Sequence, residues 1–204
     1  QNVGMGSGMQ VVIYDSIGFF SAARAWWMFR YFGHYEVAVL DGGLPAWIAA
    51  GYTTESGRGK VQPPLYPFKS KQPPDWTTTA EHLLENITSN EYLVIDARAN
   101  SRFRGDVAEP RRGLRSGHIP GSVNVPFNDL IDDESGLFKS ADKVRERFSR
   151  EGVGRAPVVV SCGSGVTACV LALGLEIAGL AEPKLYDGSW SEWGGRGDLP
   201  IETG

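Results

Sequence analysis

Apolar residues recur along this chain in short runs that alternate with longer stretches of helical periodicity. The strongest run is VVV at residues 158–160, three β-branched residues in succession, which is typical of a strand covered on both faces. Further strands are predicted at residues 10–14, 36–40, 92–96, 122–125 and 184–186. Helices are predicted at residues 19–32, 44–50, 76–88, 142–150, 166–178 and 189–193. This alternation predicts an α/β fold with a mainly parallel sheet flanked by helices.

The best-defined unit is a strand, a glycine-bearing loop and a helix near the end of the chain. Cys162 stands where the strand ends, and Gly163 and Gly165 permit loop conformations that a Cβ resists. Leu171 and Leu175 recur at helical spacing, which predicts an amphipathic helix. Unpaired N–H groups at its start favour an anion in the loop. A free cysteine is usually a small buried apolar residue. The Gly-Ser-Gly loop instead favours a nucleophilic thiolate.

The first fifty residues repeat the last fifty. Asp15 falls at the position of Cys162, so the first copy lacks the nucleophile, and Trp47 falls at the position of Trp193. The first copy also lacks a counterpart of residues 76–155. We therefore expect tandem domains of which the first is incomplete in this chain, its front piece lying outside it. The expected boundaries are residues 1–57 for the incomplete domain, 58–74 for a proline-rich linker and 75–204 for the complete domain, whose first helix Thr77 or Thr78 caps.

The composition narrows the function classes. With 204 residues, 42% of them hydrophobic, the chain can bury a substantial core. Its formal net charge of -4 argues against nucleic acid or an anionic membrane surface as a partner, and no apolar run approaches the roughly 20 residues of a membrane span. Cys162 and Cys169 form neither a disulfide framework nor a metal site, which indicates a reducing compartment, by default the cytoplasm. The histidines are scattered, and no metal or cofactor is expected.

Four sequence motifs of the chain occur together in one enzyme family. They are the loop Cys162-Gly163-Ser164-Gly165-Val166-Thr167, the turn and strand GHIPGSVNVP from residue 117, the segment from Arg102 to Arg111, and Tyr186-Asp187-Gly188-Ser189-Trp190. With these motifs the chain resembles, over nearly its whole length, the 3-mercaptopyruvate sulfurtransferases of the rhodanese superfamily. The resemblance implies tandem rhodanese-like domains with catalysis in the second.

The resemblance also implies a chemistry for the loop. Cys162 would take sulfur from 3-mercaptopyruvate as a persulfide, release pyruvate, and pass the sulfur to a thiol acceptor such as thioredoxin, or to cyanide. Ser164 would relay a proton, or is simply the small residue that the loop demands. The family's partners of this serine, a histidine and an aspartate of the first domain, would lie outside this chain. The expected substrate-binding residues are Arg102, Arg111, Gly163, Gly165, Val166 and Thr167.

The composition of the loop bears on the sulfur donor. Rhodaneses that use thiosulfate carry basic residues after the cysteine, whereas Gly163 and Ser164 are neutral. A neutral loop suits a donor whose charge sits on a remote carboxylate, which Arg102 and Arg111 can bind in a two-pronged way. The remaining arginines of this region are expected to be structural or rim charges; they are Arg98, Arg104, Arg112 and Arg115.

Other interpretations of the same residues stay open. His118 is expected to be a structural hydrogen-bonding residue, and Thr167 either donates to the sulfur or caps the helix. Cys169 is expected to be buried two turns into the helix, and Asp187 to shape the turn beside the loop. A cysteine phosphatase would need an arginine six positions after the cysteine, where Ala168 stands, and arsenate reduction lacks its cysteine relay. A thiosulfate sulfurtransferase, an idle sulfur-binding module and an inactive truncated chain remain as alternatives.

Overall fold

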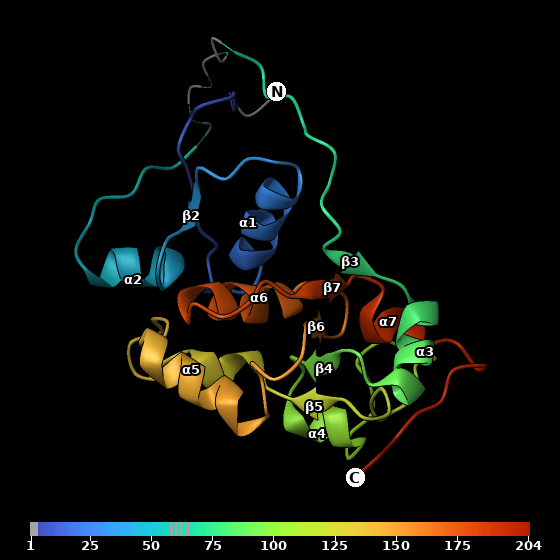
Figure 1. Cartoon of the computed structure of the whole chain (residues 1–204). Coiled ribbons are helices and arrows are strands. Elements are labelled where there is room, and N and C mark those ends of the chain that lie inside the picture. Colours follow the sequence, from blue (N-terminus) through green and yellow to red (C-terminus); the bar gives the residue numbers. More distant parts are fainter. Residues whose placement is uncertain (1–3, 58, 60, 62, 64–65) are drawn as a thin grey trace.

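The larger sheet of the protein contains five strands that pair in parallel in the order β3-β7-β6-β4-β5 (Figure 1). The computed structural model describes residues 4–57, 59, 61, 63 and 66–204. The strands of this sheet are β3 (Thr77–Thr78), β4 (Leu93–Asp96), β5 (Val123–Asn124), β6 (Val158–Ser161) and β7 (Lys184–Tyr186). The expected α/β fold with a parallel sheet flanked by helices is confirmed.

Helices cover both faces of this sheet. They are α3 (Ala80–Ser89), α4 (Asn100–Arg104), α5 (Ala141–Arg150), α6 (Ala168–Ile177), α7 (Ser189–Trp193) and the 3-10 helix η1 (Phe127–Leu130). Successive residues of a strand point to opposite faces. Accordingly, Val158 and Val160 of β6 pack in one apolar cluster with α5 and α6, while Val159 packs in a second cluster with α3 and α7. The central strand therefore serves two cores, which explains its continuous run of valines.

Helix α6 is buried on all sides instead of being amphipathic, which corrects the expectation from its sequence. Every residue from Ala168 to Leu175 is buried. One face of α6 packs on the sheet, and helix α1 (Ala22–Tyr31) covers the opposite face with Trp26 and Trp27 (Figure 1). Fully burying each large apolar side chain in this contact contributes roughly 1.5–3 kcal/mol. The first copy of the repeat thus fixes the helix that follows the cysteine loop.

The first copy forms a second, smaller sheet. Strands β1 (Val11–Ile13) and β2 (Val37–Val39) pair in parallel, and helix α2 (Gly43–Ala49) follows β2. The equivalence of the two copies extends to single hydrogen bonds. The Leu44 N–H donates to the Asp15 carbonyl at 3.0 Å, and the Trp190 N–H donates to the Cys162 carbonyl at 2.9 Å. The domain boundaries at residues 57 and 75 stay a prediction. Residues 1–3, 58, 60, 62, 64 and 65 of the first unit and the linker lie outside the described residues.

Two local expectations are wrong. Thr77 and Thr78 do not cap a helix; they form β3 at the edge of the sheet, because β-branched residues favour an extended backbone and β7 offers a free edge there. The cap of α3 is Thr79, whose side chain accepts the His82 N–H at 3.3 Å. Between residues 98 and 115, where the sequence pattern predicts neither a helix nor a strand, the chain forms the five-residue helix α4.

Candidate active site

Cys162 lies at the carboxyl end of β6, directly before the loop that leads into α6. Its side chain is buried, and its sulfur lies 3.4 Å from the backbone nitrogen of Ser164, which donates to it. Helix α7 holds the same loop, because the N–H groups of Trp190 and Ser191 donate to the carbonyl groups of Cys162 and Gly163 at 2.9 and 3.0 Å. The sulfur therefore sits in a fixed turn at the start of a helix, where an anion is favoured.

The side chain of Ser189 holds this loop in place through hydrogen bonds. Its hydroxyl accepts the N–H groups of Cys162 at 3.3 Å and Gly165 at 2.9 Å and donates to the Tyr186 carbonyl at 2.9 Å. Ser189 is fully buried and has a φ of +51°, a left-handed conformation that costs energy outside glycine. The sequence did not single out Ser189. The signal lay in the repeat, because the equivalent position of the first copy is Gly43, which has a φ of +58°.

Two glycines of the loop are required by close neighbours. A Cβ on Gly163 would lie 3.1 Å from Nη2 of Arg102, so the small residue admits a guanidinium against the loop. Gly165 has a φ of +73°, and a Cβ there would lie 2.5 Å from Oδ1 of Asp187. The absence of a side chain at Gly163 thus leaves room for the Arg102 guanidinium next to the cysteine loop. The absence of a side chain at Gly165 leaves room for the Asp187 carboxylate on the other side of the loop.

Three arginines and two acids build the wall opposite the loop. Arg98 is only 2% exposed; it binds both Asp96 oxygens through Nε and Nη2 at 2.7–3.1 Å and Glu109 at 2.9 Å. Glu109 also binds Arg102, with Arg102 Nη2 at 2.5 Å from Glu109 Oε2. Arg98 is therefore a structural residue, and it is not a rim charge. It holds Glu109, and Glu109 orients Arg102.

Arg111 supplies the remaining positive charge. Its Nη1 donates to the Ser191 hydroxyl, and that hydroxyl donates to the Gly163 carbonyl at 2.5 Å, so Arg111 is tied to the cysteine loop. Among the described residues, no acidic side chain forms an ion pair with Arg111. Three guanidinium groups thus face two carboxylates. The excess positive charge favours a small anionic ligand.

The three arginines and Glu109 line a cavity of about 300 Å³ together with the cysteine loop. Of the residues expected at the site, Cys162, Gly163, Ser164, Val166, Thr167, Arg102 and Arg111 all line it. Gly165 does not line it; its backbone lies behind the loop and its carbonyl faces Arg24 at 3.3 Å. Apolar side chains complete the wall, including Phe20 from the first copy and Phe127, whose rings pack edge to face with centroids 6.4 Å apart. Phe20, Glu109 and Phe127 were not expected from the sequence.

The other open residues have structural surroundings. His118 is buried, stacks on Phe103 with ring centroids 3.8 Å apart, and donates from Nδ1 to the Phe103 carbonyl at 2.8 Å. The side chain of Thr167 makes no capping hydrogen bond within the described part of the chain. Cys169 is the second residue of α6 and not two turns into it. Burial raises the pKa of its thiol to about 12, although the charge of Arg24 partly opposes this rise.

The first copy carries a carboxylate where the second carries its thiol. Asp15 accepts the N–H groups of Ile17, Ser21 and Ala22 at 2.8–3.0 Å, at the start of α1. Burial raises the pKa of Asp15, but these hydrogen bonds outweigh that effect and lower it below its ordinary value. In the first copy, the N–H groups of the corresponding loop are thus already bound by the protein's own carboxylate, that of Asp15.

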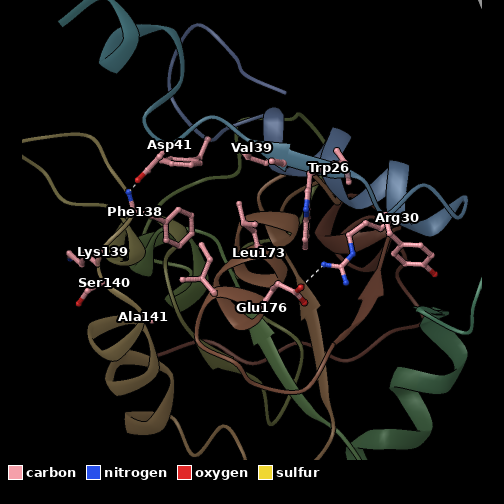
Figure 2. A pocket seen from close by; sticks show the side chains of 15 residues that line it. Trp26, Arg30, Val39, Asp41, Phe138, Lys139, Ser140, Ala141, Leu173 and Glu176 are labelled. Carbon is pink, nitrogen blue, oxygen red and sulfur yellow. Dashed lines mark hydrogen bonds and ion pairs between the residues drawn. The ribbon is translucent and has the colours of Figure 1, made fainter. Parts of the chain in front are cut away.

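A larger cavity of about 700 Å³ lies between β2, α1, α6 and residues 138–141 (Figure 2). Its charged groups already have partners. Arg30 binds Glu176 at 3.0 Å, and the carboxylate of Asp41 accepts the Phe138 N–H at 2.8 Å (Figure 2). Its lining, all of it in the described part of the chain, contains neither cysteine nor histidine. The smaller cavity, which contains Cys162 and the arginines, is therefore the candidate active site. No helix among the described residues combines the length and apolar character needed to cross a membrane.

The chain matches a model of a known protein family. The rhodanese-like domain matches residues 3–50 and 79–196, which include both copies of the repeat and the cysteine loop.

Named relatives cover nearly all of the chain. It is 46% identical to human 3-mercaptopyruvate sulfurtransferase over 94% of its length and 42% identical to the mitochondrial thiosulfate/3-mercaptopyruvate sulfurtransferase 1 of Arabidopsis thaliana over 98%. The chain spans only 64% and 58% of these two relatives. Among solved structures, the sulfur transferase subunit of yeast mitochondrial complex I superimposes with a TM-score of 0.88 at 34% identity, covering 100% of this chain and 74% of the yeast chain.

Proposed function

The chain belongs to the rhodanese-like domain family, and on that premise we propose that it is a sulfurtransferase that acts on 3-mercaptopyruvate. Its parallel sheet flanked by helices is the rhodanese fold. The observation that carries the proposal is the cavity of about 300 Å³ that the thiol of Cys162 and the guanidinium groups of Arg102 and Arg111 line together. A sulfur nucleophile and two carboxylate-binding groups within one small cavity suit an anionic sulfur donor.

In the first half-reaction, sulfur moves from the donor to Cys162. The Cys162 thiolate attacks the thiol sulfur of 3-mercaptopyruvate, and the new S–S bond forms as the donor's C–S bond breaks. The electron pair of that bond passes to carbon and leaves the enolate of pyruvate. The donor's thiol proton is transferred to this carbon, directly or through Ser164. The products are pyruvate and a persulfide anion on Cys162.

The loop stabilises negative charge on sulfur throughout this step. The Ser164 N–H already points at the Cys162 sulfur from 3.4 Å, and the positive end of the α6 helix dipole lies at the same loop. Hydrogen bonds from Ser189 and α7 hold the loop in this arrangement, which preorganises it for negative charge on sulfur.

The arginines bind the carboxylate end of the donor. Nη2 of Arg102 lies 3.1 Å from the position that a Cβ on Gly163 would occupy, and Arg111 is tied to the Gly163 carbonyl through Ser191. Guanidinium groups bind a carboxylate and an adjacent keto oxygen in a planar, two-pronged way. Bound so, the carboxylate end faces the arginines and the thiol end faces Cys162.

In the second half-reaction, a thiolate of the acceptor attacks the outer sulfur of the persulfide. The bond between this sulfur and Cys162 breaks, the Cys162 thiolate is regenerated, and the acceptor leaves as a persulfide. A dithiol acceptor such as thioredoxin then closes its own disulfide and releases hydrosulfide. Cyanide is a chemically competent alternative. Because Cys162 and a thiol acceptor must both be reduced, a reducing compartment such as the cytoplasm suits the reaction.

Thiosulfate is the second candidate donor, and one observation favours it. Although Gly163 and Ser164 are neutral, Arg102 reaches the loop from α4 and lies 3.1 Å from the Cβ position of Gly163. A cation therefore stands beside the sulfur even without a basic residue in the loop. One of the relatives also carries both donors in its name.

The test is a comparison of the two donors on the purified chain. Pyruvate release from 3-mercaptopyruvate is measured with a reduced dithiol, and thiocyanate formation from thiosulfate is measured with cyanide. We expect kcat/KM for 3-mercaptopyruvate to be higher by about tenfold or more, which corresponds to roughly 1.4 kcal/mol of transition-state binding. Equal or better turnover of thiosulfate would contradict the proposed donor. A folded chain that turns over neither donor would be an idle or incomplete module.

A further inference from the structure

Arg24 reaches from the first copy of the repeat into the loop that carries Cys162. It lies in the first turn of α1, and its Nη1 donates to Asp187 Oδ1 at 2.7 Å and to the Gly165 carbonyl at 3.3 Å. The same nitrogen is 4.0 Å from the sulfur of Cys169. Arg24 does not line the 300 Å³ cavity, so it acts on the loop from the side opposite the substrate.

We propose that Arg24 is a positioning residue for Cys162, which holds the Gly165–Val166 peptide in place and neutralises the Asp187 carboxylate behind the loop. This proposal rests on the proposed function, because it concerns how readily Cys162 becomes the sulfur-accepting thiolate. Arg24 touches neither the donor nor the sulfur of Cys162 in this account.

Arg24 is one of the groups that fix the orientation of the Gly165–Val166 peptide. The Gly165 N–H is held by the Ser189 hydroxyl at 2.9 Å, and the Gly165 carbonyl is held by Arg24 and by the Cys169 thiol at 3.4 Å. In a planar trans peptide, the carbonyl and the following N–H point in opposite directions. A carbonyl fixed toward Arg24 therefore turns the Val166 N–H toward the other side of the loop. Cys162 and Val166 both line the cavity on that side.

Arg24 also balances the negative charge of Asp187 beside the loop. The Asp187 carboxylate presses against the loop, because a Cβ on Gly165 would meet Asp187 Oδ1 at 2.5 Å. An unpaired carboxylate so close would disfavour a second negative charge on Cys162. Burial disfavours the charged form of Arg24, but the hydrogen bond and the charge of Asp187 outweigh it, and the pKa of Arg24 is raised. Arg24 therefore stays charged and cancels the field of Asp187.

Other charged or titratable groups surround the loop and stay constant in the test. On the cavity side they are Arg98, Arg102, Glu109 and Arg111, and on the side of α6 the group is Cys169. The Cys169 thiol keeps its proton near neutral pH, since burial raises its pKa to about 12. A change seen on substitution of Arg24 is thus attributed to Arg24 and Asp187.

The chain offers a matched control on the same helix. Arg30 of α1 is also partly buried and also pairs with α6, through Glu176 at 3.0 Å, but it faces the larger cavity and not the loop (Figure 2). The comparison is between Arg24→Met, Arg24→Lys, Arg24→Met combined with Asp187→Asn, and Arg30→Met. The readout is the rate at which iodoacetamide alkylates Cys162 as a function of pH, located by peptide mass. This readout needs no sulfur donor.

We expect Arg24→Met to slow the alkylation of Cys162 near neutral pH by about threefold or more and to shift the midpoint of the alkylation rate against pH upward. The cause is the loss of a partly exposed charge pair, which leaves the Asp187 carboxylate without its partner. Arg24→Lys keeps most of the wild-type rate, because its ammonium still faces Asp187. The double variant returns the midpoint to the wild-type pH, because the carboxylate is gone, while turnover stays reduced through the free Gly165 carbonyl. Arg30→Met alkylates like wild type.

Two results would overturn the proposal. One is an Arg24→Met protein that is folded by circular dichroism and alkylates with the wild-type profile. The other is an equal fall in Arg30→Met, which would make the effect a general loosening of α1 against α6. Failure of the proposed function looks different: no donor is turned over by the wild-type chain, yet the alkylation shift of Arg24→Met persists and supports the positioning role.

Discussion

The backbone N–H of Ser164 points at the sulfur of Cys162 from 3.4 Å. This contact belongs to the main chain, so it survives the removal of the Ser164 side chain. Ser164 also lines the cavity, and its hydroxyl is a group separate from this N–H. The two contributions of this residue, anion stabilisation and proton relay, are therefore separable by experiment.

Ser164→Ala tests the relay. We expect iodoacetamide to alkylate Cys162 at the wild-type rate, because the N–H is retained, while pyruvate release from 3-mercaptopyruvate falls by about tenfold or more through loss of a proton-transfer group. Stopped-flow measurement of pyruvate in a single turnover gives the rate. Full turnover in Ser164→Ala would mean that the serine is only the small residue that the loop requires.

Arg102 and Arg111 are expected to set the affinity for the donor. Arg102→Met and Arg111→Met should each raise KM for 3-mercaptopyruvate by about 10–100-fold, the effect of losing one charge-assisted hydrogen bond to a carboxylate. Arg104→Met is the control, because Arg104 belongs to the same helix as Arg102 but is half exposed and pairs only with Asp106 in the described structure. An unchanged KM in both cavity variants would show that Arg102 and Arg111 do not bind the carboxylate of the donor.

Arg98 is expected to matter for stability, since it is the shared partner of Asp96 and Glu109. The Arg98→Met variant leaves two buried carboxylates, of which Asp96 loses its guanidinium partner and keeps the hydrogen bond from the backbone N–H of residue 98. The substitution should lower the free energy of unfolding by about 3–5 kcal/mol. Urea titration measures the loss. The exposed pair of Arg150 and Glu146 provides a control, and Arg150→Met should change stability by about 0.5 kcal/mol or less. Similar losses in both variants would contradict the buried network.

Asp15 predicts a pH dependence in the first copy. Its pKa is lower in the folded chain than its ordinary value of 3.8, so the ionised carboxylate stabilises the fold above that pH and this contribution is lost as the pH falls through the lower folded-state value. Asp15→Asn should therefore cost about 0.5–2 kcal/mol near neutral pH. In urea titrations the gap to wild type should close below pH 3.8. A gap that is independent of pH would show that ionisation is not the source.

The sequence carried the parts of this molecule that depend on local pattern. The valine run of β6 and the glycines beside Cys162 predicted the strand and the loop, because burial on both faces and backbone freedom are visible in the residue types themselves. The roles of the site residues stay a prediction. The repeat also identified Asp15 as the counterpart of Cys162, and both residues end a strand before a helix.

What the sequence did not carry depends on contacts between distant segments. The residues of α6 do not indicate by themselves that α1 covers this helix. Likewise, the residues around Arg98 do not indicate that Glu109 connects Arg98 to Arg102. Ser189 was hidden because serine rarely adopts a left-handed conformation, and only comparison with Gly43 in the first copy marks the position.

The most direct test of the account is the intact mass of the chain after exposure to 3-mercaptopyruvate without an acceptor. We expect the wild-type chain and Cys169→Ser to gain the mass of one sulfur atom, which a dithiol then removes, with one pyruvate released for each sulfur bound. Cys162→Ser should gain nothing. A sulfur gained by Cys162→Ser, or pyruvate released without Cys162, would contradict the assignment of Cys162 as the sulfur-accepting thiolate.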